Sequence, residues 1–323
     1  MIYVPSKNYL DAEVGAGNGL CGYYKFIRYK VASNGHPILA SAVSTDWFPN
    51  LIVNAGLNRI GTNEDWLTFC QVGTGSTPPA DTDTALQSRL AAHSSLNASI
   101  AIGNSTTPPF YVGRRNTYRF NAGVATGTLS EVGVGWASTG SLFSRALILD
   151  GGGSPTTITV LADEVLDVVY EIRSYGPETD QTGNVTITGV GTLSYTLRMA
   201  SAGSAGVGTI NSNGAIGGIL TSAPHDHTLW TGAIGAATST PSGTQASASS
   251  ASNSAYSNNS YQRTGSVVWG LGAGAITVRS IVVVAGASAA SQFGRMQYEL
   301  SSTIPKTGAN VLTINYTHSW ARR

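Results

Sequence analysis

Two stretches of the chain, VLDVVYEI at 165–172 and VLTINYTH at 311–318, share one pattern of apolar residues. Leu166, Val168 and Tyr170 correspond to Leu312, Ile314 and Tyr316, each displaced by 146 positions (312 − 166). Alternate side chains of a strand point to the same face, so these six residues predict two equivalent strands with a buried apolar face. The residues between them differ, which is typical of a sheet packed on one side only.

Further short matches follow in the same order along both halves of the chain. They are TLSEVGV (128–134) with TVRSIVV (277–283), NTY (116–118) with NSY (259–261), FSR (143–145) with FGR (293–295), and TI (157–158) with TI (303–304). This order predicts an internal duplication. A chance likeness between two β-rich segments is the alternative, because strands use a limited set of residue types.

Short apolar runs separated by Gly- and Pro-rich turns indicate an all-β protein of sandwich type. We expect two tandem β-sandwich-like domains, the first over 46–176 and the second over 177–323. Residues 1–45 are predicted to form an N-terminal docking arm. A Gly/Ser-rich insertion is expected at 201–260 in the second domain, as a variable surface loop or as an outward-facing recognition segment.

The predicted arm contains YYKFIRYKVAS (23–33), which mixes aromatic, branched and basic residues as an edge strand does. Tyr23, Tyr24, Phe26 and Ile27 are the residues expected to hook onto a neighbour by strand addition.

Charged residues make up only 11% of the 323 residues, and the net charge is +1. Globular domains usually have about 25%. So little charge predicts surfaces covered by neighbouring subunits, and it gives no electrostatic signature of nucleic-acid binding. Only four lysines occur, at 7, 25, 30 and 306, although lysine commonly protects exposed strand edges. The edges are therefore expected to be hidden in an assembly.

The sequence contains few residues in a pattern that indicates catalysis or metal binding. Cys21 and Cys70 lack metal-type spacing and are expected to be reduced thiols. HDH (225–227) has metal-ligand residue types, with a solvated loop as the alternative. Asp81 with Asp83, and Asp163 with Glu164, are expected in turns.

Phosphate-binding and nucleophile motifs are not found, so no catalytic residue, cofactor or metal is predicted. The tryptophans are expected in the core rather than in a sugar-stacking platform. The start of the sequence does not resemble a signal peptide and no apolar run of about 18 residues occurs, so synthesis in the cytoplasm without membrane insertion is expected.

Three stretches resemble a group of structural proteins from tailed-bacteriophage virions. They are WFPNLIVNAGLNRIG (47–61), VGTGSTPPADTDTALQSRLA (72–91) and SRALILDGGGSPTTITVLADEVLDVVYEIR (144–173). The resemblance covers about 44–175, and the group is described as tail or tail-fibre proteins. It implies a non-enzymatic virion component that assembles as an oligomer, with no catalytic residues to transfer.

We therefore expect a tail-associated or fibre-type virion protein, made in the bacterial host and assembled as a symmetric homo-oligomer, a trimer or hexamer. Other virion proteins, and host surface glycan, are the expected partners. A capsid-decoration or collar protein is one alternative. A glycan-binding receptor protein is another, and a depolymerase is a third for which the sequence offers no carboxylate pair.

Overall fold

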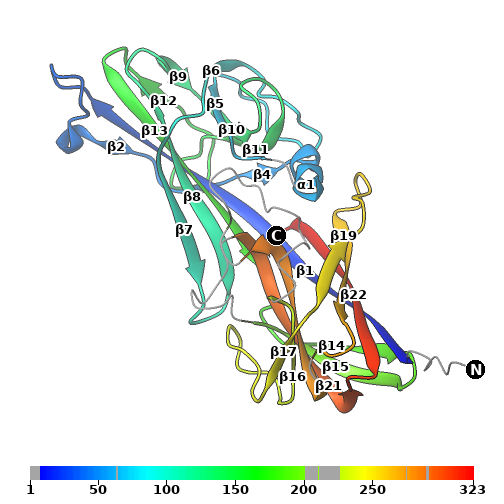
Figure 1. Ribbon diagram of the computed structural model, residues 1–323. Coiled ribbons are helices and arrows are strands. Elements are labelled where there is room, and N and C mark those ends of the chain that lie inside the picture. Colours follow the sequence, from blue (N-terminus) through cyan, green and yellow to red (C-terminus); the bar gives the residue numbers. More distant parts are fainter. Residues whose placement is uncertain (1–7, 63–64, 201–209, 211–225, 274, 289–290) are drawn as a thin grey trace, which may run out of the picture.

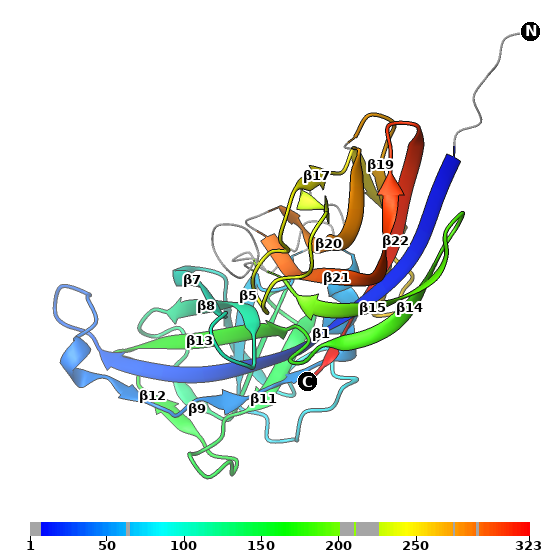
Figure 2. The ribbon, with the colours of Figure 1, turned by 90° about the horizontal axis from the view of Figure 1, so that it is seen from below.

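A computed structural model describes residues 8–62, 65–200, 210, 226–273, 275–288 and 291–323. The chain is nearly all β, which confirms the all-β prediction. Figure 1 shows an elongated molecule with two lobes, crossed along its length by the first strand, β1 (Asn8–Lys30). Figure 2 shows the same strand running from one lobe into the other.

The largest sheet has nine strands and is shared by the two lobes. Its order is β18 (Ser250–Asn253), β19 (Gln262–Trp269), β22 (Asn310–Arg322), β1, β13 (Glu164–Tyr175), β8 (Tyr111–Phe120) and β7 (Leu96–Asn104), with β2 (Val43–Ser44) and β3 (Phe48–Pro49) also paired to β1. The first half of β1 pairs in parallel with β22, and its second half pairs antiparallel with β13. One strand therefore ties the two lobes together.

In the first lobe a five-stranded sheet faces β13, β8 and β7. Its order is β4 (Leu51–Ile52), β11 (Leu142–Leu147), β10 (Glu131–Gly135), β5 (Phe69–Gly73) and β6 (Arg89–His93). The lobe also contains α1 (Asn54–Gly61), a 3-10 turn (Leu39–Ser41), and the pair β9 (Gly127–Leu129) with β12 (Ile158–Val160). Gly56 lets α1 approach the sheet, because a Cβ there would lie 2.2 Å from the Phe143 carbonyl oxygen.

In the second lobe a six-stranded sheet faces β22, β19 and β18. Its order is β14 (Gln181–Ile187), β15 (Gly191–Met199), β21 (Ser291–Lys306), β20 (Ile276–Ser288), β16 (Thr228–Trp230) and β17 (Gln245–Ser247).

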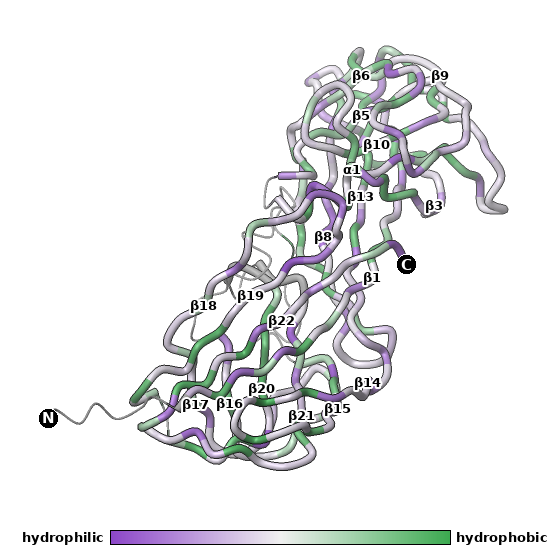
Figure 3. The backbone as a smooth tube through the Cα atoms, turned by 90° about the vertical axis from the view of Figure 1, so that its right-hand side faces the viewer, coloured by the Kyte–Doolittle hydropathy of each residue, from purple (hydrophilic) through white to green (hydrophobic). Residues whose placement is uncertain are grey.

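One apolar core runs through both lobes. The repeated residues Leu166, Val168, Tyr170, Leu312, Ile314 and Tyr316 are all buried in it. Figure 3 shows apolar residues distributed over the sheets of both lobes, rather than in one of them. The alternation of buried and half-exposed residues along β22 follows from a strand packed on one face.

The two lobes have the same strand order. β6, β5, β10 and β11 of the first lobe correspond to β17, β16, β20 and β21 of the second, and β7, β8 and β13 correspond to β18, β19 and β22. The matched TI pairs agree with this correspondence, because Leu129 pairs with Ile158 and Val278 pairs with Ile304. An origin by internal duplication stays a prediction.

Two of the short sequence matches do not fall at equivalent places. Val168 pairs with Tyr118 and Ile314 pairs with Val267, so the counterpart of Tyr118 is Val267 rather than the tyrosine of NSY. FGR is likewise displaced by two residues relative to FSR. Taking Val132 and Ile281 as equivalent, their partners Ala146 and Tyr298 make Gln297 the counterpart of Arg145.

The expected docking arm and insertion differ from the structure. Residues 8–30 form the central strand of the largest sheet instead of a separate arm. Positions 201–209 and 211–225 lie outside the described residues, but 226–260 supply β16, β17 and β18. Leu229 of β16 is buried in the core, whereas the small and polar residues of β17 and β18 are half-buried or exposed.

Candidate assembly surface

The four residues expected to dock onto a partner lie on opposite faces of β1. Tyr24 and Phe26 are fully buried, and the Tyr24 hydroxyl shares a 2.9 Å hydrogen bond with the Ser144 hydroxyl. Their predicted role as hooks is therefore wrong for this fold, because the core occupies their side chains. Tyr23 and Ile27 are half-buried on the other face, where a docking role stays a prediction.

That second face, hereafter the outer face, belongs to the first-lobe part of the nine-stranded sheet. Its centre is Arg115 on β8, which is held by Glu171 of β13 through Nε at 2.8 Å and Nη2 at 2.7 Å. Glu171 is only 1% exposed. The guanidinium carbon of Arg115 lies 5.3 Å from the ring centre of Trp47, which is 41% exposed. A buried carboxylate thus fixes an arginine beneath an accessible tryptophan.

A second arginine on the outer face is fixed in the same way. Arg173 donates from Nε to the other oxygen of Glu171 at 2.6 Å. Its guanidinium carbon lies 4.9 Å from the ring centre of Tyr23 and 4.7 Å from that of Tyr111. The pKa of Tyr23 is raised to about 12, first by its hydrogen bond with Cys21 and then by burial. Tyr23 therefore stays neutral beside the arginine at physiological pH.

The outer face ends at the edge strand β7. None of the nine residues of β7, LNASIAIGN, is charged. Ile100 pairs with Arg115 in the ladder and is 49% exposed. Among the described residues no strand pairs with the other edge of β7. Unpaired backbone groups and a neutral sequence make this edge a template for another strand.

The segment after β1 adds apolar surface at the end of the first lobe. Figures 1 and 2 show it projecting from the lobe beside β2. Leu39 is 72% exposed, and Ile38 and Val43 are also exposed. Trp47 and Ile100 are further large apolar side chains exposed on the first lobe.

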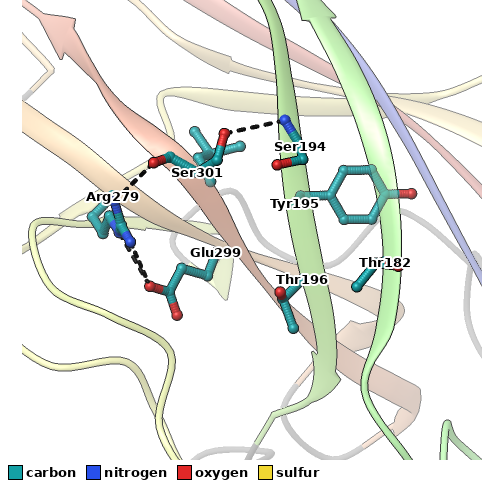
Figure 4. A pocket seen from close by; sticks show the side chains of 8 residues that line it. Thr182, Ser194, Tyr195, Thr196, Arg279, Glu299 and Ser301 are labelled. Carbon is teal, nitrogen blue, oxygen red and sulfur yellow. Dashed lines mark hydrogen bonds and ion pairs between the residues drawn. The ribbon is translucent and has the colours of Figure 1, made fainter.

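A polar pocket lies in the second lobe, on the sheet of β14, β15, β21 and β20 (Figure 4). It encloses about 160 Å³ and is lined by Thr182, Ser194, Tyr195, Thr196, Arg279, Glu299, Leu300 and Ser301. Arg279 donates from Nη2 to Glu299 at 2.9 Å and from Nη1 to the Ser301 carbonyl oxygen at 3.3 Å. The pocket combines one ion pair with several hydroxyl groups.

The residues considered for chemistry are held in structural contacts. His225 lies outside the described residues, and His227 is buried and accepts the Val284 N–H at Nδ1. Asp83 pairs with Arg145, and Glu164 pairs with Arg28. Within the described part of the chain, no three His, Cys, Asp or Glu side chains gather as a metal site would require.

The sequence did contain a signal for the outer face. Alternation along YVGRRNTYRF places Arg115 and Arg119 on one face, and along VLDVVYEIR it places Asp167 and Glu171 on one face. Arg119 pairs with Asp167, as Arg115 does with Glu171. The arginines of one strand and the carboxylates of the other therefore indicate that the two strands are neighbours, once both are assigned to one sheet.

No helix in the described residues is long and apolar enough to cross a bilayer. Comparison with protein-family models, curated proteins and solved structures found no match for the chain.

Proposed function

We propose that this protein is a structural component of a tailed-phage virion. In this proposal it is tail-associated or of fibre type, assembles as a symmetric homo-oligomer and performs no catalysis. The resemblance of residues 44–175 to virion proteins supports the virion setting. The observation that carries the assembly role is the open, uncharged edge of β7 beside the outer face.

The physical argument is that this surface is costly to leave in water. With no strand among the described residues on its outer edge, β7 offers N–H and C=O groups for pairing, without the lysines or prolines that protect natural sheet edges. Trp47 and Arg115 are of the residue types that contribute most to protein interfaces. Glu171 holds Arg115 in place beforehand, so little side-chain entropy is lost when a partner binds.

Copy number separates the tail from the other virion positions. We expect a protein of the tail in multiples of six or three for each particle, whereas a capsid-decoration protein would be present in hundreds of copies. Quantitative mass spectrometry of purified particles measures this directly. Absence of the chain from particles would overturn the proposal.

The oligomer itself is tested on the purified chain by sedimentation velocity over a range of concentrations. A symmetric oligomer that dissociates when Ile100→Lys puts charge on the β7 edge is the expected result. A lone monomer at every concentration would contradict the assembly role.

The pocket of Figure 4 favours a second candidate, a glycan-binding receptor protein. Its hydroxyls and its Arg279–Glu299 pair offer the donors and acceptors that a sugar requires, and its volume of about 160 Å³ suits one sugar ring rather than a chain. Binding of host surface polysaccharide that is lost in Arg279→Met would support this candidate. Unchanged binding in that variant would exclude the pocket.

A further inference from the structure

The two lobes differ at one sheet edge. In the second lobe, β15 covers the edge of β21 through five consecutive pairs, from Tyr195 with Leu300 to Met199 with Met296. In the first lobe, the corresponding edge of β11 is covered by β4 through two pairs only, Leu51 with Arg145 and Ile52 with Ser144. β4 therefore corresponds only to the last two paired positions of β15, and the first lobe has no counterpart of the preceding positions among its described residues.

The equivalence of Arg145 and Gln297 shows which residues of β11 lack a neighbouring strand at this edge. Arg198, which pairs with Gln297, corresponds to Leu51. Leu147 then corresponds to Glu299, whose partner is Thr196. Figure 4 shows β15 with Thr196 lying beside β21 at this position. Beside Ala146 and Leu147, no described residue takes the place of β15.

The backbone of β11 is oriented to accept another strand there. Val53 N–H donates to the Phe143 carbonyl oxygen on the β4 side, while Ile148 N–H donates to the Ser130 carbonyl oxygen on the opposite side. Because these directions alternate along a strand, the N–H and C=O of Leu147 face the β4 side. The same register would bring Pro49 opposite Leu147, but Pro49 has no N–H to donate and pairs with β1 instead.

An apolar groove lies along this edge. Its volume is about 350 Å³, and its lining residues include Pro49, Leu51, Pro78, Leu147, Leu149 and Pro155. A second cavity of about 210 Å³ adjoins it, because Leu147 and Pro155 line both. The one charged side chain in the lining is Arg145, which is neutralised by buried Glu131 at 2.8 Å. Open backbone groups beside apolar walls are the features of a site for strand addition.

We propose that the groove binds residues 1–7 of a second copy of this chain as an added strand. Their sequence, MIYVPSK, begins with four apolar residues and contains no carboxylate. In an extended strand, Ile2 and Val4 share one face and would enter the groove together. This inference rests on the proposed function, since it adds a second contact between subunits to the one proposed at the β7 edge.

Distance requires that the strand come from another copy. The groove lies beside Gly22, whose carbonyl oxygen accepts the N–H of the lining residue Asn50. From Asn8 to Gly22, β1 rises by about 46 Å at about 3.3 Å a residue. Residues 1–7 span at most about 25 Å when fully extended, so they do not reach the groove of their own molecule. A contact between different surfaces of two subunits produces a ring or a filament.

A complementation experiment tests the proposal. One variant lacks residues 1–7 and keeps the groove, and a second variant, Leu147→Glu, keeps the N-terminal residues and loses the apolar floor of the groove. In sedimentation velocity we expect each variant alone to form smaller assemblies than the unmodified chain, and an equal mixture to restore one groove contact for each pair of subunits. Pro78→Glu, at the exposed rim, serves as a second groove variant that leaves the core intact. Leu271→Glu, at an exposed turn of the second lobe, is the control and should assemble as the unmodified chain does.

The outcomes separate this inference from the proposed function. If the deletion and both groove variants assemble like the unmodified chain, the groove proposal fails while the oligomeric subunit stands. If groove variants are lost from particles but the deletion is not, another protein supplies the strand and the proposal is overturned. If the unmodified chain is a monomer, the binding of a labelled MIYVPSK peptide to the chain tests the groove proposal instead. Binding abolished by Leu147→Glu, and absent for a peptide with Ile2→Asp and Val4→Asp, supports the groove, and equal binding in all cases rejects it.

Discussion

Arg145 and Gln297 occupy equivalent places in the two lobes, and each holds a loop of its own sheet, the β5–β6 loop in the first lobe and the β16–β17 loop in the second. Arg145 donates from Nη2 to the Thr77 carbonyl oxygen at 2.9 Å. Gln297 donates from Nε2 to the Ala236 carbonyl oxygen at 3.2 Å and accepts the Gly235 N–H at 2.9 Å. The same contact is thus made once by a charged side chain and once by a neutral one. Only the charged version requires a buried counter-ion.

Glu131 is that counter-ion, and its removal should destabilise the first lobe strongly. It is fully buried, accepts the N–H groups of Gly75 and Ser88 at 3.0 and 2.7 Å, and pairs with Arg145. Glu131→Ala removes the buried anion of Arg145 and leaves only Asp83, whose side chain is 24% exposed, so we expect a loss of about 3 kcal/mol in the free energy of unfolding. Urea denaturation measures it. Glu178→Ala, at an exposed ion pair with Arg323, is the control and should change stability by less than about 0.5 kcal/mol. Equal effects of the two substitutions would contradict the assigned role.

The two lobes should unfold in one transition. β1 pairs with strands of both, and Trp320 Nε1 of β22 donates to the Leu57 carbonyl oxygen of α1 at 2.8 Å. Tyr256 stacks on Trp320 and donates to Asn58 at 2.9 Å. We expect the calorimetric enthalpy of unfolding to equal the van't Hoff enthalpy. Trp320→Ala should lower the midpoint temperature without splitting the peak, and two separate peaks in the unmodified chain would refute this expectation.

The sequence predicts the strands better than it predicts their partners. Two-residue alternation identified the buried faces of 165–172 and 311–318, because one-sided burial leaves a local pattern. Nothing local indicates that β1 pairs with both β13 and β22. The aromatic residues of β1 are as typical of a docking edge as of a core strand. Tyr24 and Phe26 belong to the core only because strands that are distant in the sequence pack against them.

Composition misled the interpretation of 226–260 for a related reason. Ser, Ala and Gly are typical of loops, yet β17 and β18 are made largely of such residues. Their pairing groups are supplied by the backbone, which composition does not report. The groove beside Leu147 could not be predicted from the sequence either. It exists because β4 covers less of the sheet edge than β15 does, and only the paired strands of the structure show that difference.

Stability should fall with acid because two histidines are buried as neutral groups. Burial lowers the pKa of His318 to about 4, and burial together with the charge of Arg295 lowers the pKa of His227 to about 3. Well above the ordinary histidine pKa of about 6.5, neither the folded nor the unfolded chain binds a proton at these rings. Below it the unfolded chain binds protons that the folded chain does not, so the free energy of unfolding decreases from pH 6.5 towards pH 4.

Denaturation at several pH values checks this expectation. His318→Gln should reduce the slope of stability against pH over that range. His36→Gln, at an exposed position, should leave the slope unchanged. An identical slope in all three proteins would show that other groups determine the acid sensitivity.

Trp47 should contribute far more to self-association than its exposed area suggests. Its ring lies over Arg115, whose guanidinium is already held by buried Glu171, so a partner that covers the ring meets an ordered surface. Trp47→Ala should weaken association by at least about 2 kcal/mol, roughly a 30-fold increase in the dissociation constant. Val190→Ala is the matched control, because Val190 is 40% exposed, against 41% for Trp47, but lies at a hairpin turn of the second lobe away from charged partners. Sedimentation equilibrium on both variants, with thermal denaturation to confirm that each is folded, makes the comparison. If the two substitutions weaken association equally, the outer face is not the assembly surface, and the loss reflects apolar area alone.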